Sequence, residues 1–120
     1  MERDNKMIRD LLIQFRNEVS PNDNSVNPNS EKEDYHIYLL MNSKFIEAER
    51  RRDMGKVLHY YDDLKITSAG HDFLDAAENE TVWNKSKDFL KRKGEDIAKV
   101  PLNVLAGVLT AQLKSHLGIE

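Results

Sequence analysis

Two clusters of basic residues are the side chains in this sequence best suited to bind a ligand. One is the run Arg50-Arg51-Arg52, followed closely by Lys56. The other lies further along the chain and comprises Lys85, Lys87, Lys91 and Arg92. Guanidinium and ammonium groups donate hydrogen bonds to phosphate oxygens, so both clusters predict contacts with a nucleic-acid backbone. The alternative interpretation of each cluster is a solvated surface without a ligand.

Residue patterns for catalysis or metal binding are missing from this sequence. Its histidines are scattered and do not have the spacing of paired metal ligands. Cysteine is absent, which excludes a disulfide, a thiolate metal site and a thiol nucleophile. There is no glycine-rich phosphate loop and no turn of the kind that presents a nucleophilic serine. We therefore predict a non-enzymatic binding protein that uses no cofactor and no metal.

The overall charge does not favour a general attraction to nucleic acid. The chain has 120 residues and a formal net charge of −3, so any attraction must be local. Its first residues are charged and lack an apolar signal core, and no segment approaches the roughly 20 apolar residues that cross a bilayer. Together with the lack of cysteine, these features predict a cytoplasmic protein without a membrane partner.

The elements that must position the basic clusters begin with two helices separated by a polar loop. Apolar residues at helical spacing predict a first helix from Asp4 to Glu18. The stretch from Ser20 to Asn29 is rich in Asn, Asp, Ser and Pro, which predicts a loop with little regular structure. Ser30 and Glu33 have the spacing of a capping box and open a second helix that extends through Asn42.

A change of hydrophobic period after the second helix indicates a two-stranded ribbon. Strands are predicted over Phe45 to Glu49 and Val57 to Ile66, with the arginine run and Gly55 in the turn between them. Three more helices follow. This order predicts one α+β domain over residues 1–120, with a winged-helix-like core over 1–79 and additional C-terminal helices over 80–120.

The last predicted helix, Pro101 to Leu117, has an apolar face wider than one packing seam. Soluble monomers rarely expose large apolar patches, so this face is expected to pack on its own domain and also on a second copy. We therefore predict a homodimer. The candidate contact residues are Leu105, Leu109, Leu113 and Leu117. The alternative is packing within one chain alone.

Three stretches, YHIYLLMNSKFIEA, ITSAGHDFLDAAENETVWNK and VPLNVLAGVL, together resemble a domain family of unknown function. Its members are short proteins of bacteria, phages and prophages, and the resemblance covers nearly the whole chain. The resemblance implies a winged-helix-like body and supplies no catalytic residues. It also implies an ordered, strand-forming connection at the place of the polar loop.

A winged-helix-like body with basic clusters predicts binding to double-stranded DNA, by a DNA-binding or regulatory protein of phage or prophage origin. The second helix complicates this function, because its first turn contains Glu31, Glu33 and Asp34, which repel phosphates. The alternative function is a protein-interaction or inhibitor module that acts on a host or phage protein without nucleic acid. If the two basic clusters lie side by side, they form one site.

Overall fold

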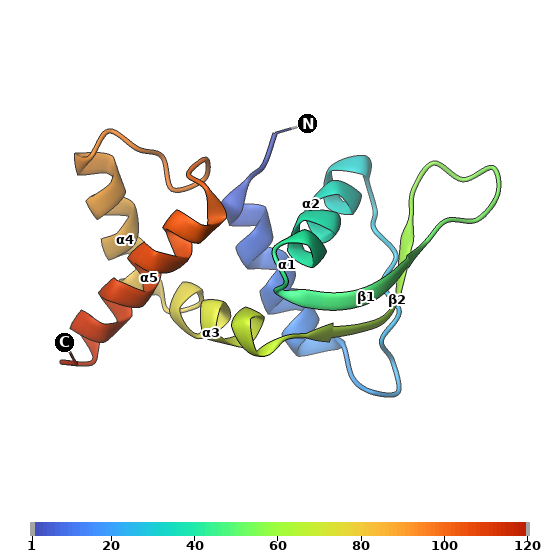
Figure 1. Cartoon of the computed structure of the whole chain (residues 1–120), viewed down its shortest axis with the longest axis horizontal. Helices are drawn as coiled ribbons and strands as arrows, with labels where there is room; N and C mark the ends of the chain where they lie inside the picture. The colour runs from blue at the N-terminus through green and yellow to red at the C-terminus, as the bar shows by residue number, and fades with distance from the viewer. Residues whose placement is uncertain (1, 120) are drawn as a thin grey trace.

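Five helices and one two-stranded antiparallel sheet make up the computed structural model, which describes residues 2–119 (Figure 1). The helices are α1 Asn5–Glu18, α2 Glu31–Asn42, α3 Ser68–Ala77, α4 Glu80–Arg92 and α5 Leu102–His116. The strands are β1 Ile46–Arg51 and β2 Tyr60–Ile66. The predicted α+β class is confirmed, and the order of α1, α2 and a two-stranded ribbon agrees with the predicted order of elements.

Side-chain caps explain why four of the helices begin where the sequence predicts. In each case the side chain before the helix accepts a hydrogen bond from a backbone N–H of the first turn, which would otherwise lack a partner. These capping residues are Asp4, Ser30, Thr67 and Asn79. The last helix, α5, instead follows Pro101, which has no N–H to satisfy.

The hydrophobic core is centred on α1, whose Ile8, Leu12 and Phe15 are almost fully buried. This helix contacts α2, α3 and β2, while α4 and α5 pack against α3 and against each other. The buried side chains of α4 and α5 belong to the same cluster as those of α1. The C-terminal helices therefore share one core with the ribbon half of the molecule.

The polar loop between α1 and α2 is joined to β2 by backbone hydrogen bonds. Val26 forms an antiparallel bridge with Tyr61 of β2, with N–O distances of 2.8 and 2.9 Å. The N–H of Leu64 also donates to the carbonyl of Asn24 at 3.0 Å. The loop thus lies along the edge of β2 that β1 leaves open. The prediction of a loop with little regular structure is confirmed, since residues 20–29 form isolated bridges and no helix or strand. The backbone partners that the edge of β2 offers to this loop are not revealed by composition.

The molecule is elongated, with extents of 49 × 30 × 18 Å. Figure 1 shows the ribbon at one end of the long axis and α4 with α5 at the other. We call residues 52–59, which join β1 to β2, the wing. Its Met54 and Val57 are exposed, so the wing extends from the body into solvent.

Gly70, in the first turn of α3, lies at a close approach between two parts of the chain. A Cβ at this position would lie 2.1 Å from the carbonyl oxygen of Phe45, which also accepts the N–H of Thr67 at 3.0 Å. Because the obstacle is backbone, it cannot rotate away. We expect Gly70→Ala to lower the free energy of unfolding by about 1–3 kcal/mol, although alanine usually favours a helix.

Urea unfolding measures this effect, with Gly107→Ala in α5 as the matched control. A Cβ at Gly107 would meet nothing within 4 Å, so that variant should be unchanged or more stable by up to about 1 kcal/mol. Equal stability of the two variants would show that the chain before β1 can move away from α3.

Candidate functional site: two separate basic surfaces

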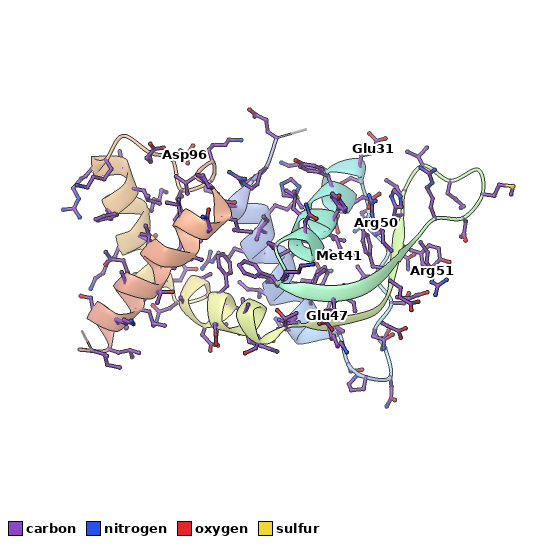
Figure 2. The ribbon with its side chains drawn as sticks, in the orientation of Figure 1. Glu31, Met41, Glu47, Arg50, Arg51 and Asp96 are labelled. Atoms are coloured by element: carbon purple, nitrogen blue, oxygen red, sulfur yellow. The ribbon has the colours of Figure 1, made fainter. Side chains whose placement is uncertain are left out.

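Arg50 is held between α2 and the ribbon by contacts within the chain. Its guanidinium stacks over the ring of Tyr38, 4.4 Å from the ring centroid, and its Nε donates to the Tyr61 hydroxyl at 3.2 Å. Figure 2 shows Arg50 on the side of the ribbon that faces α2. The structure places this residue in β1 rather than in the predicted turn. Its guanidinium is therefore already engaged by two aromatic side chains.

Arg51 is also engaged, in this case by carboxylates. It forms ion pairs with Glu49 and with Asp62, the latter with 3.4 Å between Nε and Oδ2. Arg51 is the one member of the predicted cluster with a carboxylate oxygen within 4.0 Å, counting partners among residues 2–119. Arg50 is held by Tyr38 and Tyr61 instead, which leaves Arg52 and Lys56 as the members with neither kind of contact. The positive charge that the wing can offer to a ligand is therefore smaller than the sequence predicts.

A buried hydrogen-bond network beneath Arg50 joins α2 to the end of the wing. Asp34, which is 6 % exposed, accepts the Tyr61 hydroxyl at 2.6 Å and the backbone N–H of His59 at 2.9 Å. It also lies 3.0 Å from Nδ1 of His59. Sequence reasoning missed this network, since its members are far apart in the chain and match no motif.

The network stabilises an ionised carboxylate. Burial alone raises the pKa of Asp34, but the hydrogen bonds from His59 and Tyr61 lower it by more, so its pKa lies below the usual value. Burial, together with the hydrogen bond to Asp34, raises the pKa of the Tyr61 hydroxyl. The carboxylate and the neutral phenol therefore form a fixed polar support for the ribbon.

His36 has a structural role that uses both ring nitrogens. The side chain is fully buried, its Nε2 accepts the backbone N–H of Asp4 at 2.8 Å, and its Nδ1 lies 2.7 Å from the carbonyl of Lys32. One nitrogen accepts and the other donates, which is the pattern of a neutral imidazole. His36 thus joins the start of α1 to α2.

The outer side and the C-terminal end of α4 carry a group of cations without carboxylate partners among residues 2–119. Helix α4 turns Val82, Trp83 and Leu90 into the core, and the opposite side faces solvent. The exposed basic residues are Lys85, Lys87, Lys91, Arg92 and, at the helix end, Lys93. We call these five residues the α4 basic face. Within the described chain, none of them has a carboxylate oxygen within 4.0 Å.

The nearby carboxylates form no ion pairs with the cations of the α4 basic face, so they do not neutralise its positive charge pairwise. Glu80, at the start of α4, pairs with Arg9 at 2.8 Å instead of with the basic face. Arg9 also donates to the carbonyl of Ala77 at 2.6 Å and lies over the Trp83 ring, which fixes the start of α4 against α1. Asp88 is the acidic residue among the cations of the face, and it makes no ion pair with them within 4.0 Å.

Part of the α4 basic face borders a hollow between α4 and α5. The hollow has a volume of about 580 Å³. Its lining residues are Lys85, Asp88, Lys91, Arg92 and Gln112. Sequence reasoning named the three cations but missed Asp88 and Gln112. Gln112 comes from α5, so only the packing of the two helices reveals its proximity.

The two predicted basic clusters do not lie side by side. The wing and α4 are at opposite ends of the longest dimension, 49 Å (Figure 1). The condition for a single combined site is therefore not met, because α3 and the core separate the ribbon from α4. Each surface must act independently or contact distant parts of a large ligand.

The leucines predicted to contact a second copy divide between core and surface. Leu105 and Leu109 are 0 % exposed, and Leu113 is partly buried against the core. Leu117 is 60 % exposed. The prediction of intermolecular contact needs correction for Leu105 and Leu109, because α3 and α4 cover the inner side of α5. The spacing of the leucines identified the buried side of α5, but it did not show that α3 and α4 cover that side.

Residues 2–119 contain neither a cluster of metal-binding side chains nor a helix suited to cross a membrane. No group of three or more His, Asp and Glu side chains in this part of the chain is placed to hold a metal ion. In the same residues, no helix combines the length and the apolar character that crossing a membrane requires.

Comparison with known proteins gives a family but no activity. Residues 2–96 match the family described as "Hypothetical protein (DUF2513)", a region that ends before α5. The chain is also similar to a protein of Haemophilus influenzae called "Uncharacterized protein". The identity is 26 % over 121 residues, covering 94 % of this chain and 98 % of the relative. No solved structure matches the chain.

Proposed function

Since the chain belongs to the DUF2513 family, whose description names no activity, we propose a function from its own surface: non-enzymatic binding of nucleic acid. The phosphate contacts come from Lys85, Lys87, Lys91 and Arg92 of the α4 basic face. The observation that supports this proposal is that these exposed cations lack carboxylate partners within 4.0 Å in the described chain. Such cations displace condensed counterions when they meet phosphate, which favours binding.

The proposal gives the wing a smaller part than the sequence predicts. Arg50 and Arg51 have partners within the chain, and the first turn of α2 contains Glu31 and Glu33 (Figure 2 shows Glu31 at the start of α2). These carboxylates oppose the entry of α2 into a DNA groove. Contacts to the phosphate backbone need no such entry, so we expect binding to double-stranded DNA with little sequence preference.

A protein partner is the second candidate function, and it concerns the other end of the molecule. Met54 and Val57 expose their apolar side chains on the wing, where no part of the body covers them. Exposed apolar side chains on a projecting loop suit a protein surface better than a phosphate backbone. In that case the module acts on a host or phage protein, and nucleic acid is not required.

Charge reversal tests the nucleic-acid proposal, with fluorescence anisotropy of a labelled duplex as the measurement. We expect Lys85→Glu combined with Lys91→Glu to weaken binding at low salt by about tenfold or more. Arg52→Glu combined with Lys56→Glu changes the net charge by the same amount at the wing, and should weaken binding by less than about threefold. The comparison therefore separates a local site from a general effect of charge.

The salt dependence supplies a second readout. Four phosphate contacts give a slope of about −3.6 in a plot of log affinity against log salt concentration, and the α4 double variant should reduce its magnitude by about 2. Equal losses in the two double variants would argue against a site on α4. A wild-type protein that does not bind duplex at low salt would exclude the proposed function.

A further inference from the structure

We propose that the hollow between α4 and α5 binds a phosphate monoester, which in a nucleic acid is the phosphate at the end of a strand. This inference rests on the proposed binding through α4 and adds the chemical group that the site prefers. The hollow is lined by three cations, one carboxylate and one amide. Their arrangement and their charge both favour this ligand over an internal phosphodiester.

The arrangement of the cations favours one compact anion. Lys85 and Arg92 are separated by seven residues, or about two helical turns, and therefore share one stripe of α4. Lys91 lies beside Arg92 and borders the same hollow. From the other wall, Gln112 of α5 brings a side-chain amide that donates hydrogen bonds. Cations gathered around one hollow suit a single anionic group better than a row of phosphates.

The charge of the ligand should match the excess positive charge of the hollow. A phosphate monoester carries a charge of about −1.5 to −2 near neutral pH, with three acceptor oxygens. An internal phosphodiester carries one negative charge and two free oxygens. Since Lys85, Lys91 and Arg92 are opposed by Asp88 alone within the hollow, the doubly charged group gains more from this site.

Asp88 provides a test that does not depend on loss of function. Its carboxylate lines the hollow, and it repels any anion that enters. We expect Asp88→Asn to bind a phosphorylated end about threefold to tenfold more tightly than the wild type does. A gain of this kind cannot come from misfolding.

The experiment compares two duplexes of one sequence, one with a 5′-phosphate and one with a 5′-hydroxyl. We expect the wild type to prefer the phosphorylated duplex by about fivefold to tenfold. Arg92→Gln should remove the preference. Lys87→Gln is the matched control, because Lys87 lies on α4 but does not line the hollow. It should weaken binding of both duplexes and leave their ratio unchanged.

The outcomes separate this inference from the function on which it rests. If neither duplex binds, the proposed function is wrong. If both bind equally well and Asp88→Asn changes nothing, α4 binds nucleic acid but the hollow does not select a monoester. A nucleoside 5′-monophosphate, added as competitor, identifies the source of the group. If the competitor removes only the preference for the phosphorylated duplex, the hollow binds strand ends. If the free nucleotide binds more tightly than the phosphorylated duplex does, the hollow is assigned to a small ligand.

Discussion

Leu109→Ala in α5 should lower the free energy of unfolding by about 2–5 kcal/mol. Leu109 is 0 % exposed and belongs to the core cluster, where α5 packs against α3 and α4. Shortening the side chain loses apolar burial and leaves a cavity that the neighbouring side chains fill only in part. Because small domains have a total stability of about 5–15 kcal/mol, this single change removes a large share of it.

Leu117→Ala is the matched control, since Leu117 follows the same helix and is 60 % exposed. It should change the free energy of unfolding by less than about 0.5 kcal/mol. Urea unfolding followed by circular dichroism measures both variants, and sedimentation velocity measures their mass. The predicted homodimer is tested in the same experiment: if the wild type associates, Leu117→Ala should weaken the association. Dissociation of a stable Leu109→Ala variant would instead place Leu109 at an interface.

Asp34→Asn should lower the free energy of unfolding by about 2–3 kcal/mol at neutral pH. The carboxylate accepts hydrogen bonds from the Tyr61 hydroxyl and the His59 backbone N–H, and it faces the His59 ring. An asparagine amide places N–H groups toward donors that need an acceptor, so at least one buried group loses its partner. The connection between α2 and β2 is weakened as a result.

The effect of Asp34→Asn should depend on pH. The pKa of Asp34 in the folded protein lies below its unfolded value of about 3.9, because hydrogen bonds favour the charged form more than burial disfavours it. The carboxylate therefore contributes its full stability above about pH 5, and this contribution falls as the pH decreases through the folded-state pKa. The stability difference between wild type and variant should be constant from about pH 5 to 8 and shrink below about pH 4.

Asp53→Asn is the control for this measurement, because Asp53 lies exposed in the wing. That variant should differ from the wild type by less than about 0.5 kcal/mol throughout the pH range. A difference between wild type and Asp34→Asn that stays the same at pH 3 and pH 7 would mean that the charge of Asp34 contributes nothing. In that case only its shape and hydrogen-bonding capacity matter.

Local signals were sufficient to predict the helices and the presence of the ribbon. Capping by Ser30 or Asn79 acts within one helical turn, and hydrophobic periodicity is a property of a short segment. The ends of the ribbon were less predictable. Strand β1 continues through Arg51 because Arg50 and Arg51 pair with Tyr61 and Tyr60 of β2. Pairing depends on both strands together, so neither segment alone reveals it.

The sequence identified which residues of the candidate site are cations, but not which of them are paired with carboxylates in the folded chain. In the sequence, Arg51 and Lys91 are both basic residues within a basic stretch, and nothing local distinguishes their availability to a ligand. In the folded chain Arg51 meets Glu49 and Asp62, whereas Lys91 borders an open hollow with Gln112. Whether a cation is available to a ligand depends on which distant carboxylates approach it, and that approach follows from tertiary packing.

The sequence by itself determined the α+β class, the absence of thiol chemistry and the two groups of basic residues. These follow from composition and from interactions between residues close along the chain. Tertiary structure alone decided that the basic groups lie at opposite ends, that Val26 pairs with β2, and that Leu109 faces the core. The physical reason is the same in each case. Periodicity shows that one side of an element avoids water, but the partner that covers it comes from a distant part of the chain.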